Sequence, residues 1–573
     1  MHHPDPAPQA PDAPSRLRPA YEALALDLHR RGHTDVFGLM SDDTALFVAT
    51  LDAIGVRFHA ARHENTAIAM AEGYAAASGR LGIAVIGRGP ATANALHGAL
   101  YAHRAGSRTL LIFGVAPTAP ASAPDSKAFN TLGVFEAAGL RTWIAAPAAA
   151  ALHTLDTAIR ASEQGGCTCL LLPADVQTAL LPDPGDSGHP APASVLAGPV
   201  RQPARGAALE AAAAILNRAR RPLFVVGAGA HRSDARTAIE ALADQLGAVV
   251  ATTLKAKDMF HGYPYALGIV GSFSHAAGRR LIAQADCIVA FGASLNLRTT
   301  SYGTALPADV PLIQIDIAAA TIGRTCHADV VLLADAQTAA RQLCSAIAPR
   351  AADARPFHTP DNRQRLADHR WADEFTSQHT ARTMDPRSCA IDIDRLLPPD
   401  RNAVYDAGNF LQIIPYVSGL GPDHLKTSMD FASVGMGLGT ALGFARGCPQ
   451  RTTVLFVGDG GLMMSLGDLE TAVREDIPLV VVVLNDCAYG AELHYLRLRQ
   501  MPVAQSLFAD IDFAPLAQSF GFQAWTVRSV EELRDLAPVL ANPQGPILID
   551  CKINADVAAG YHTEVLAHTH KRR

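Results

Sequence analysis

Residues 453–461 read Thr-Val-Leu-Phe-Val-Gly-Asp-Gly-Gly, an apolar run that stops at a glycine-rich turn holding one aspartate. Two further apolar runs follow, at residues 479–484 and 546–550, and residues 466–474 have helical composition. Continuous apolar strands that alternate with helices are typical of parallel sheets covered on both faces. This part of the chain therefore predicts a doubly wound α/β domain, a fold that binds ligands where its strands end.

The same alternation occurs earlier in the chain. Near the N-terminus, apolar runs at residues 83–86 and 109–113 flank a helical stretch over residues 92–105. The middle of the chain has four apolar runs separated by helical segments, at residues 222–227, 248–253, 287–292 and 311–316. The repetition predicts three doubly wound parallel sheets.

Two proline-rich stretches, residues 181–192 and 348–360, interrupt this alternation. Proline fixes φ and glycine breaks helices, so we expect both stretches to be linkers. The predicted domains are therefore residues 1–183, 184–355 and 356–573. Residues 1–15, rich in proline and alanine, are expected to fray, and the basic residues 568–573 to form a mobile tail.

The composition excludes several classes of protein. Of the 573 residues, 49% are hydrophobic and 18% are charged, which excludes a disordered chain. The formal net charge of -6 argues against a nucleic-acid partner, since such proteins usually carry a basic face. The apolar runs are much shorter than the roughly 20 residues that a membrane helix needs. We therefore expect a small-molecule substrate, with neither nucleic acid nor membrane as a partner.

The nine cysteines are scattered along the chain, and none forms a Cys-x-x-Cys pair. This spacing and the odd number argue against a disulfide framework. The first residues show no basic region followed by an apolar core, so a signal peptide is not expected. These features predict a reducing, cytoplasmic location.

Two aspartates follow neighbouring apolar runs and could hold a cation. Asp459 lies among glycines, and Asp486 opens a loop after the next run. Mg²⁺ prefers oxygen ligands and is usually bound by one or two carboxylates together with phosphate oxygens. Asp459, Asp486 and the carbonyl of Ala488 would leave room for a diphosphate. Taken alone, Gly458-Asp459-Gly460 is explained equally well as a tight turn without a ligand.

A second motif changes this balance. Gly458-Asp459-Gly460 followed by Asn485-Asp486 resembles the fingerprint of thiamin diphosphate enzymes. Residues 62–67, Arg-His-Glu-Asn-Thr-Ala, resemble the segment that carries the catalytic glutamate of that family, and residues 87–94 resemble its Gly-Pro-Gly loop with Ala91 in place of a glycine. The order of the three blocks is similar to that of the acetolactate synthase and pyruvate oxidase branch. The resemblance covers about residues 18–553.

The resemblance implies thiamin diphosphate and Mg²⁺ as cofactors and Glu64 as the residue that activates the former. In the family, this glutamate protonates the aminopyrimidine ring, a task that suits a buried carboxyl with a raised pKa. The alternative is a first-turn glutamate that the helix dipole favours. The implied metal ligands are Asp459, Asp486 and Ala488.

The resemblance also implies a set of cofactor contacts. Gly408 and Asn409 would meet the diphosphate, the carbonyl of Ala432 would face the aminopyrimidine, and Val434 would prop the cofactor into its bent shape. The remaining implied contacts lie on the two loops after the apolar runs: Gly458, Asp459, Gly460, Gly461, Asp486, Ala488, Tyr489, Gly490 and Ala491.

The substrate side departs from the acetolactate synthases, because Tyr495 stands where they carry a tryptophan. Residues 490–495 look more like the corresponding stretch of benzaldehyde lyase. Glu492 could protonate or orient an intermediate, or be a solvated helix glutamate. Asn130 is the stand-in for the active-site glutamine of the branch. Asp42 and Asp43 either face the pocket or cap a helix.

The middle block holds a weak dinucleotide signal at residues 227–229. In the family this block can bind FAD, and Arg298 fits the flavin-binding pattern. Ser294 and Asn296 depart from the usual arginine and aspartate, so FAD is not favoured.

The sequence thus predicts a carbon–carbon lyase or ligase acting on 2-oxo acids or 2-hydroxy ketones. One alternative is a 2-oxo acid decarboxylase that does not ligate, with Glu492 as the acid. Another is a catalytically retired family member that serves as a binding or regulatory protein, although Glu64, Asp459 and Asp486 are retained. Because the family builds its site between two chains, we expect a homodimer or homotetramer.

Overall fold

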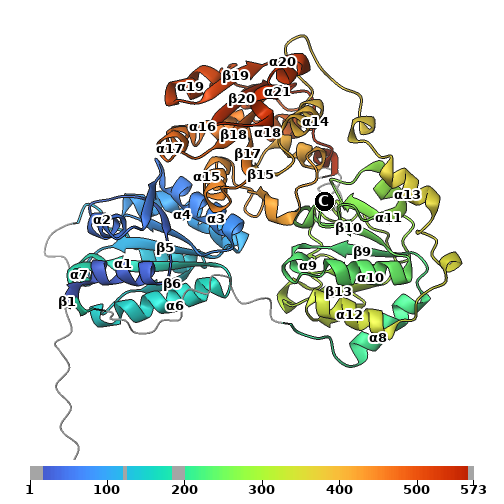
Figure 1. Ribbon diagram of the computed structural model, residues 1–573, viewed down its shortest axis with the longest axis horizontal. Coiled ribbons are helices and arrows are strands. Elements are labelled where there is room, and N and C mark those ends of the chain that lie inside the picture. Colours follow the sequence, from blue (N-terminus) through green and yellow to red (C-terminus); the bar gives the residue numbers. More distant parts are fainter. Residues whose placement is uncertain (1–16, 120–124, 184–200, 565–573) are drawn as a thin grey trace, which may run out of the picture. The chain divides into compact units, whose positions relative to one another are not determined.

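The computed structural model describes residues 17–119, 125–183 and 201–564 (Figure 1). The predicted frayed N-terminus, most of the predicted linker at residues 181–192 and the C-terminal tail lie outside these residues. The chain divides into two compact units, Met1–Leu196 and Ala197–Arg573, and the second unit contains two of the three sheets.

The first unit is built around a six-stranded parallel sheet with strand order β3-β2-β4-β5-β7-β6. Its strands are β2 Asp35–Leu39, β3 Arg57–Ala60, β4 Gly82–Ile86, β5 Thr109–Val115, β6 Arg141–Ile144 and β7 Cys167–Pro173. Its helices are α1 Ala20–Arg30, α2 Ala45–Ala53, α3 Glu64–Ser78, α4 Pro90–Ala105, α5 Thr131–Ala137, α6 Ala151–Glu163 and α7 Ala174–Thr178. A short antiparallel pair, β1 Leu17–Pro19 and β8 Leu180–Pro182, joins the two ends of this unit.

The second sheet, also parallel, has the order β11-β10-β9-β12-β13-β14. Its strands are β9 Pro222–Val226, β10 Val249–Thr252, β11 Ala266–Ile269, β12 Cys287–Phe291, β13 Leu312–Asp316 and β14 Val330–Leu333. The helices around it are α8 Ala207–Arg218, α9 Ala228–Arg232, α10 Arg236–Leu246, α11 Ala276–Ile282 and α12 Ala336–Ala346. A connecting stretch with α13 Pro360–Ala367 and the 3-10 turn η5 Trp371–Glu374 leads to the third sheet.

The third sheet is parallel with the order β16-β15-β17-β18-β20-β19. Its strands are β15 Arg401–Tyr405, β16 Leu425–Thr427, β17 Thr452–Gly458, β18 Leu479–Asn485, β19 Gln523–Val527 and β20 Ile547–Lys552. Its helices are α14 Pro386–Leu396, η6 Asn409–Tyr416, α15 Gly437–Gly447, α16 Asp459–Met463, α17 Leu469–Arg474, α18 Gly490–Arg497, α19 Phe513–Phe520, α20 Val530–Asp535 and α21 Ala537–Ala541.

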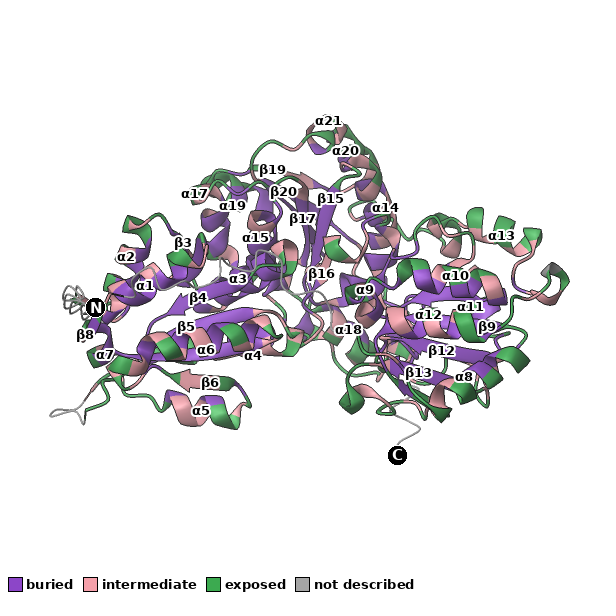
Figure 2. Ribbon diagram, turned by 60° about the horizontal axis from the view of Figure 1, so that its bottom comes forward, coloured by how far each residue is buried: buried purple, intermediate pink, exposed green. Residues whose placement is uncertain are grey.

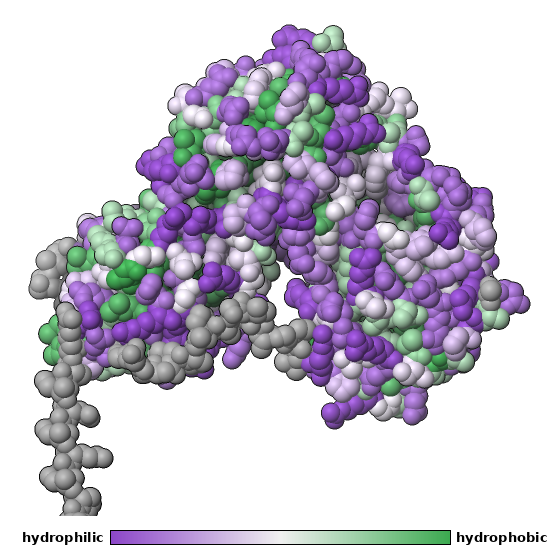
Figure 3. Space-filling view, viewed as in Figure 1, coloured by the Kyte–Doolittle hydropathy of each residue, from purple (hydrophilic) through white to green (hydrophobic). Residues whose placement is uncertain are grey.

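The predicted fold class, three doubly wound parallel sheets, is confirmed. The central strands of each sheet are buried, edge strands such as β6 and β14 are less so, and the outward faces of many helices are exposed, as Figure 2 shows. Near-continuous apolar strands such as β18, in which every residue is buried, require this cover on both faces. On the face drawn in Figure 3, hydrophilic side chains surround hydrophobic patches over the part that holds the third sheet. Among the described helices, none is long and apolar enough to cross a membrane.

Two local predictions were wrong in detail. Residues 458–461 are not a free turn, because β17 ends at Gly458 and α16 begins at once with Asp459. An aspartate in the first helical turn is favoured by the helix dipole, which explains how a helix starts among glycines. The helix expected over residues 466–474 is split into the 3-10 turn η8 Leu466–Asp468 and α17.

Candidate functional site

Asp459 and Asp486 lie together at one edge of the third sheet. β17 and β18 are parallel neighbours with Gly458 opposite Leu484, so both aspartates follow at the carboxyl ends of their strands. Asp459 is 8% exposed and Asp486 is partly buried. Burial raises the pKa of both carboxyls, and the nearby charge of Asp459 raises the pKa of Asp486 further. Two carboxylates held this close fit a divalent cation, which would offset their repulsion.

The loop after β18 is held in one shape around Asp486. The Asp486 carboxylate accepts a hydrogen bond from the backbone N–H of Ala488 at 3.2 Å. A side chain at Gly490 would place its Cβ 2.5 Å from the other oxygen of Asp486, so only glycine fits beside this carboxylate. Ala488 itself is buried. The predicted ligands Asp486 and Ala488 therefore belong to one rigid turn.

Further polar groups brace this turn from behind. The Asn485 amide donates to the Asp550 carboxylate at 3.0 Å, and its oxygen accepts from the backbone N–H of Cys487 at 3.2 Å. Lys552, itself buried, lies 3.0 Å from Asp550 and 2.6 Å from Asp510. These contacts fix the backbone that carries Asp486.

Asp406, directly after β15, was missed as a functional residue by the sequence analysis. It is fully buried and accepts hydrogen bonds from the backbone N–H groups of Gly435 at 2.7 Å and Gly437 at 3.3 Å, and from the Ser428 hydroxyl at 3.2 Å. Burial raises its pKa to about 6, although these hydrogen bonds act in the opposite direction. Asp406 thus holds the loop 428–437. The sequence held no clear signal for it, because β15 reads Arg-Asn-Ala-Val-Tyr and the partners of Asp406 lie about 30 residues later in the chain.

The loop 428–437 carries the predicted contacts Ala432 and Val434. Ala432 has φ 52°, in the left-handed region that alanine rarely adopts. Such strain persists only where the surroundings enforce it, and it clusters at functional sites. Val434 is 38% exposed, which is unusual for a valine on a tightly held loop. Gly461, also predicted as a cofactor contact, packs against Asp406, since a Cβ there would lie 2.4 Å from the Asp406 carboxylate.

The side chain of Asn409 forms hydrogen bonds with the C-terminal part of the chain. Its oxygen accepts hydrogen bonds from the backbone N–H of Ala559 at 3.2 Å and from His562 Nε2 at 3.0 Å, and its nitrogen donates to the Val557 carbonyl at 3.3 Å. Asn409 can therefore meet a diphosphate through its backbone, as can Gly408.

Glu64 is the first residue of α3 in the other unit. The preceding His63 caps the helix, its ring nitrogen accepting from the backbone N–H of Asn65 at 3.1 Å. Glu64 is 7% exposed, and the amide of Asn94, at the end of the Gly-Pro-Gly-like segment, donates to its carboxylate at 3.3 Å. The first-turn position agrees with the dipole alternative, whereas the burial and the Asn94 contact go beyond what that alternative needs. The two motifs of this unit, residues 62–67 and 87–94, are thus in contact through Glu64 and Asn94.

Asp43 lies where the ends of β2 and β4 meet. Its carboxylate accepts from the backbone N–H of Arg88 at 3.1 Å and from the Ser41 hydroxyl at 2.6 Å. Asp42 pairs with Lys127 at the surface. The residue at the N-cap of α2 is Thr44, so the interpretation of Asp42 and Asp43 as helix caps is wrong.

The predicted substrate-side residues have ordinary local surroundings. Asn130 is exposed and caps α5, its oxygen accepting from the backbone N–H of Gly133 at 3.0 Å. Glu492 is exposed in the first turn of α18. Tyr495 is 47% exposed, and the guanidinium of Arg499 lies 3.8 Å from its ring centre. Local structure thus accounts for Asn130 without a ligand.

A cavity of about 740 Å³ lies at the carboxyl ends of the second sheet, against residues Thr427, Met429 and Asp430 of the third. This volume is within the usual range for organic ligands. Arg298 lines the cavity, as do Ser294 and Asn296, the two departures from the flavin pattern. Nη1 of Arg298 is buried and has no hydrogen-bond partner within the described residues.

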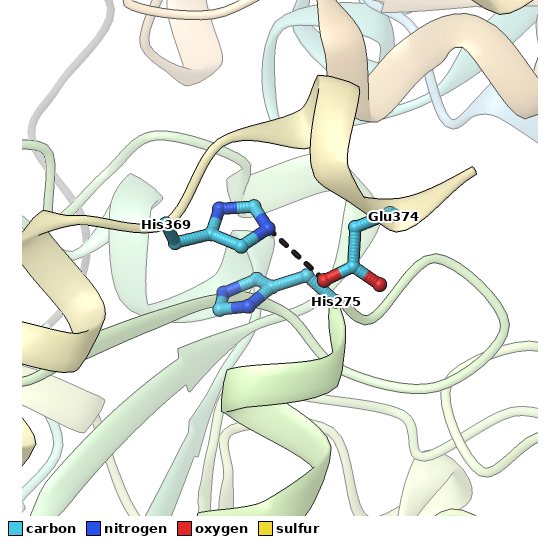
Figure 4. A group of neighbouring side chains, drawn as sticks. All are labelled: His275, His369 and Glu374. Atoms are coloured by element: carbon cyan, nitrogen blue, oxygen red, sulfur yellow. Dashed lines mark hydrogen bonds and ion pairs between the residues drawn. The ribbon is translucent and has the colours of Figure 1, made fainter. Parts of the chain in front are cut away.

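His275, His369 and Glu374 form a cluster with potential metal-ligand atoms within 4.8 Å of one another (Figure 4). His275 Nδ1 accepts from the backbone N–H of Gly278 at 3.2 Å, and the Glu374 carboxylate accepts from Ala276 at 2.8 Å. The two imidazoles are stacked, with centroids 4.0 Å apart, so they present faces to each other. One acceptor of His275 and one of Glu374 are thus engaged by the start of α11, and His369 Nε2 lies 3.2 Å from the same Glu374 oxygen. We therefore interpret the cluster as a structural contact that joins α11 to the connecting stretch.

Three family models match the chain, together covering most of its length. Residues 19–137 match the thiamine pyrophosphate enzyme N-terminal TPP binding domain, and residues 209–343 match the central domain of the same enzymes. Residues 406–551 match the thiamine pyrophosphate enzyme C-terminal TPP binding domain. Glu64 lies in the first of these segments, and the paired aspartates lie in the third.

Curated proteins with different activities match over nearly the whole chain. A sulfoacetaldehyde acetyltransferase of Rhodobacter capsulatus is 28% identical over 95% of this chain and 96% of its own length. A probable acetolactate synthase large subunit of Methanocaldococcus jannaschii is 25% identical over 93% and 91%. A probable 2-ketoarginine decarboxylase of Pseudomonas aeruginosa is 28% identical over 92% of both chains.

Proposed function

Because the chain belongs to the thiamine pyrophosphate enzymes, we propose that it is a Mg²⁺-dependent carbon–carbon lyase or ligase acting on 2-oxo acids or 2-hydroxy ketones. That it is a thiamine pyrophosphate-dependent enzyme follows from the family. The finer activity is supported by the names of its relatives, which include acetyl transfer, acetolactate synthesis and decarboxylation. The observation that carries the proposal is the paired carboxylates of Asp459 and Asp486 beside a glycine-bounded turn.

The residues at the edge of the third sheet fit the diphosphate end of the cofactor. Thiamin diphosphate, when bound, supplies a nucleophilic carbon that attacks a carbonyl group. Asp459, Asp486 and the carbonyl of Ala488 would hold Mg²⁺, which in turn takes phosphate oxygens as ligands. The backbones of Gly408 and Asn409 would meet the same phosphates. Ala432 and Val434, on the loop that Asp406 holds, would meet the aminopyrimidine and support the bent cofactor.

Glu64 would hold a proton at the pyrimidine ring nitrogen. Its burial keeps water away from the carboxyl, and Asn94 fixes one of its oxygens and leaves the other available. The carboxyl would thus be the chain's own proton-bearing contact to the pyrimidine end of the cofactor. Glu64→Gln retains size and hydrogen bonding while it removes the acid.

Decarboxylation without ligation is the second candidate. It is supported by the exposed Glu492, which could donate a proton at the mouth of the site, and by the relative named as a 2-ketoarginine decarboxylase. The two candidates differ in product, since ligation gives an acyloin and simple decarboxylation gives a free aldehyde.

A product screen tests the proposal. The purified protein with thiamin diphosphate and Mg²⁺ is given 2-oxo acids and 2-hydroxy ketones, each with and without an aldehyde acceptor, and the products are identified by mass spectrometry. Glu64→Gln should lose at least about a hundredfold in turnover, since a positioned acid contributes about that much. Glu136→Gln, an exposed glutamate on α5, is the matched control. Unchanged turnover in Glu64→Gln would refute the assigned mechanism.

We extend the proposal to assembly, location and flavin. A homodimer or homotetramer is supported by exposed apolar side chains near the predicted site, at Phe431, Val434, Met463, Met464 and Tyr489, and light scattering tests it.

A cytoplasmic location is supported by nine free cysteines, all in the described residues. FAD is not part of the proposal, and a flavin spectrum from the purified protein would overturn that choice.

A further inference from the structure

The segment from Val557 to Glu564 lies against the turn at Gly408 and Asn409, about 150 residues away in the chain. Three of its residues contact the Asn409 side chain, as described above. Tyr561 contacts the backbone of the turn instead. Its hydroxyl lies 3.1 Å from the Gly408 carbonyl and 3.3 Å from the Asn409 carbonyl, donating to both.

Tyr561 is well suited to a fixed donor role. Its side chain is buried, at 6% exposure, and burial raises its pKa to about 12, so the hydroxyl keeps its proton at neutral pH. The guanidinium of Arg298 lies 4.1 Å from the centre of its ring, and Phe273 packs on it edge-on with centroids 6.1 Å apart. Residues from the loops after β11 and β12 of the second sheet thus hold the ring, while the hydroxyl reaches the turn after β15 of the third.

The planarity of the peptide bond gives this contact a consequence for ligand binding. In a trans peptide the carbonyl of one residue and the N–H of the next point in opposite directions. A hydroxyl that draws the carbonyls of Gly408 and Asn409 to itself therefore aims the N–H groups of Asn409 and Phe410 the other way. Backbone N–H groups aimed together at the start of η6 form the kind of nest that binds phosphate oxygens.

We propose that Tyr561 is a positioning residue that orients the Gly408–Asn409 turn toward the diphosphate of the cofactor. This inference rests on the proposed function, because it assumes that the turn meets a diphosphate. Arg298 lines the 740 Å³ cavity and packs on the face of the Tyr561 ring, so it helps to fix the ring while the hydroxyl contacts the turn.

The test compares Tyr561→Phe with Tyr263→Phe in the full-length protein. Both variants lose one hydroxyl, but that of Tyr263 donates to Asp244 at 2.8 Å. Calorimetry measures binding of thiamin diphosphate and of thiamin monophosphate, each with Mg²⁺. Tyr561→Phe should raise the Kd for thiamin diphosphate about three- to tenfold, as expected for one lost hydrogen bond, and that for thiamin monophosphate less.

Two further readouts separate positioning from general stability. In the cofactor-free protein, hydrogen exchange of the amides at residues 409–412 should be faster in Tyr561→Phe and unchanged in Tyr263→Phe. Saturating thiamin diphosphate should restore kcat in Tyr561→Phe. Equal Kd values for wild type and Tyr561→Phe would overturn this inference alone. Failure of the unmodified protein to bind thiamin diphosphate would overturn the proposed function and this inference together.

Discussion

Removal of the His275 imidazole should make the protein less sensitive to acid. His275 is 6% exposed, and burial, aided by the charges of His369 and Arg279, lowers its pKa from 6.5 to about 4, while Glu374 acts in the opposite direction. Between pH 6.5 and pH 4, the His275 imidazole is therefore protonated in the unfolded chain but neutral in the folded protein. Folding stability is retained above pH 6.5 and is lost as the pH falls toward 4.

The size of this effect follows from the shift in pKa. A shift from 6.5 to about 4 is linked to a loss of about 2 kcal/mol in the free energy of unfolding between pH 7.5 and pH 5, and about 3 kcal/mol by pH 4. His275→Asn removes the titration, yet keeps an acceptor for the Gly278 N–H, because asparagine is among the best N-cap residues. The variant's free energy of unfolding should therefore fall by about 2 kcal/mol less than that of wild type over the same pH range.

Urea unfolding at pH 7.5, 6.5, 5.5 and 5.0 measures this difference. Trp371 is a local fluorescence reporter, since its ring centre lies 5.6 Å from that of His275 and 5.0 Å from that of His369. Histidines outside this cluster keep their surroundings in both proteins, so the difference reports on His275 together with its contact to His369. His153→Asn, at an exposed position on α6, controls for loss of a histidine elsewhere. Equal pH dependence in wild type and His275→Asn would refute the reasoning.

Other predictions concern the proposed cofactor site. Gly490→Ala should weaken Mg²⁺-dependent thiamin diphosphate binding at least about tenfold, because the new Cβ would lie 2.5 Å from the Asp486 carboxylate. Calorimetry measures the Kd, and an unchanged value would contradict this expectation. Asp406→Asn should lower the free energy of unfolding at pH 7 by about 1–3 kcal/mol, since one buried N–H loses its acceptor, and urea midpoints equal to wild type would count against it. Chelation of Mg²⁺ by EDTA should abolish the rise in Tm that thiamin diphosphate causes, and a rise that survives EDTA would exclude Asp459 and Asp486 as cation ligands.

The fold could be predicted from the sequence because its signal is local. Central strands such as β17 and β18 are short, mostly apolar runs, and Asp459 and Asp486 follow the ends of these two strands. The signal is weaker at β15, which is buried although it begins with Arg401 and Asn402. Parallel neighbours bring the ends of their strands to the same edge, so the pairing of these aspartates follows from topology. Local composition was less reliable at residues 458–461, where the helix dipole at Asp459 outweighed the glycines.

The supporting residues could not be predicted, because their partners are distant in the chain. Asp406 contacts Gly435 and Gly437 about 30 residues later, and Tyr561 contacts Gly408 and Asn409 about 150 residues earlier. No spacing rule links such positions. The same holds for the side chain of Asn409, which is engaged by the segment from Val557 to His562, about 150 residues later.

The first and third sheets share one strand order. Counted from the first strand of each sheet, β3-β2-β4-β5-β7-β6 and β16-β15-β17-β18-β20-β19 both read 2-1-3-4-6-5, whereas the second sheet reads 3-2-1-4-5-6. The two sheets therefore place the ends of their strands, and the loops that follow them, at equivalent positions. The loops after the third strand of each sheet are one such pair: Gly87–Pro90 in the first sheet and Gly458–Gly461 in the third. The loop of the first sheet carries Arg88 where the loop of the third carries Asp459, the aspartate proposed as a cation ligand, so the same place in one topology presents opposite charges in the two sheets.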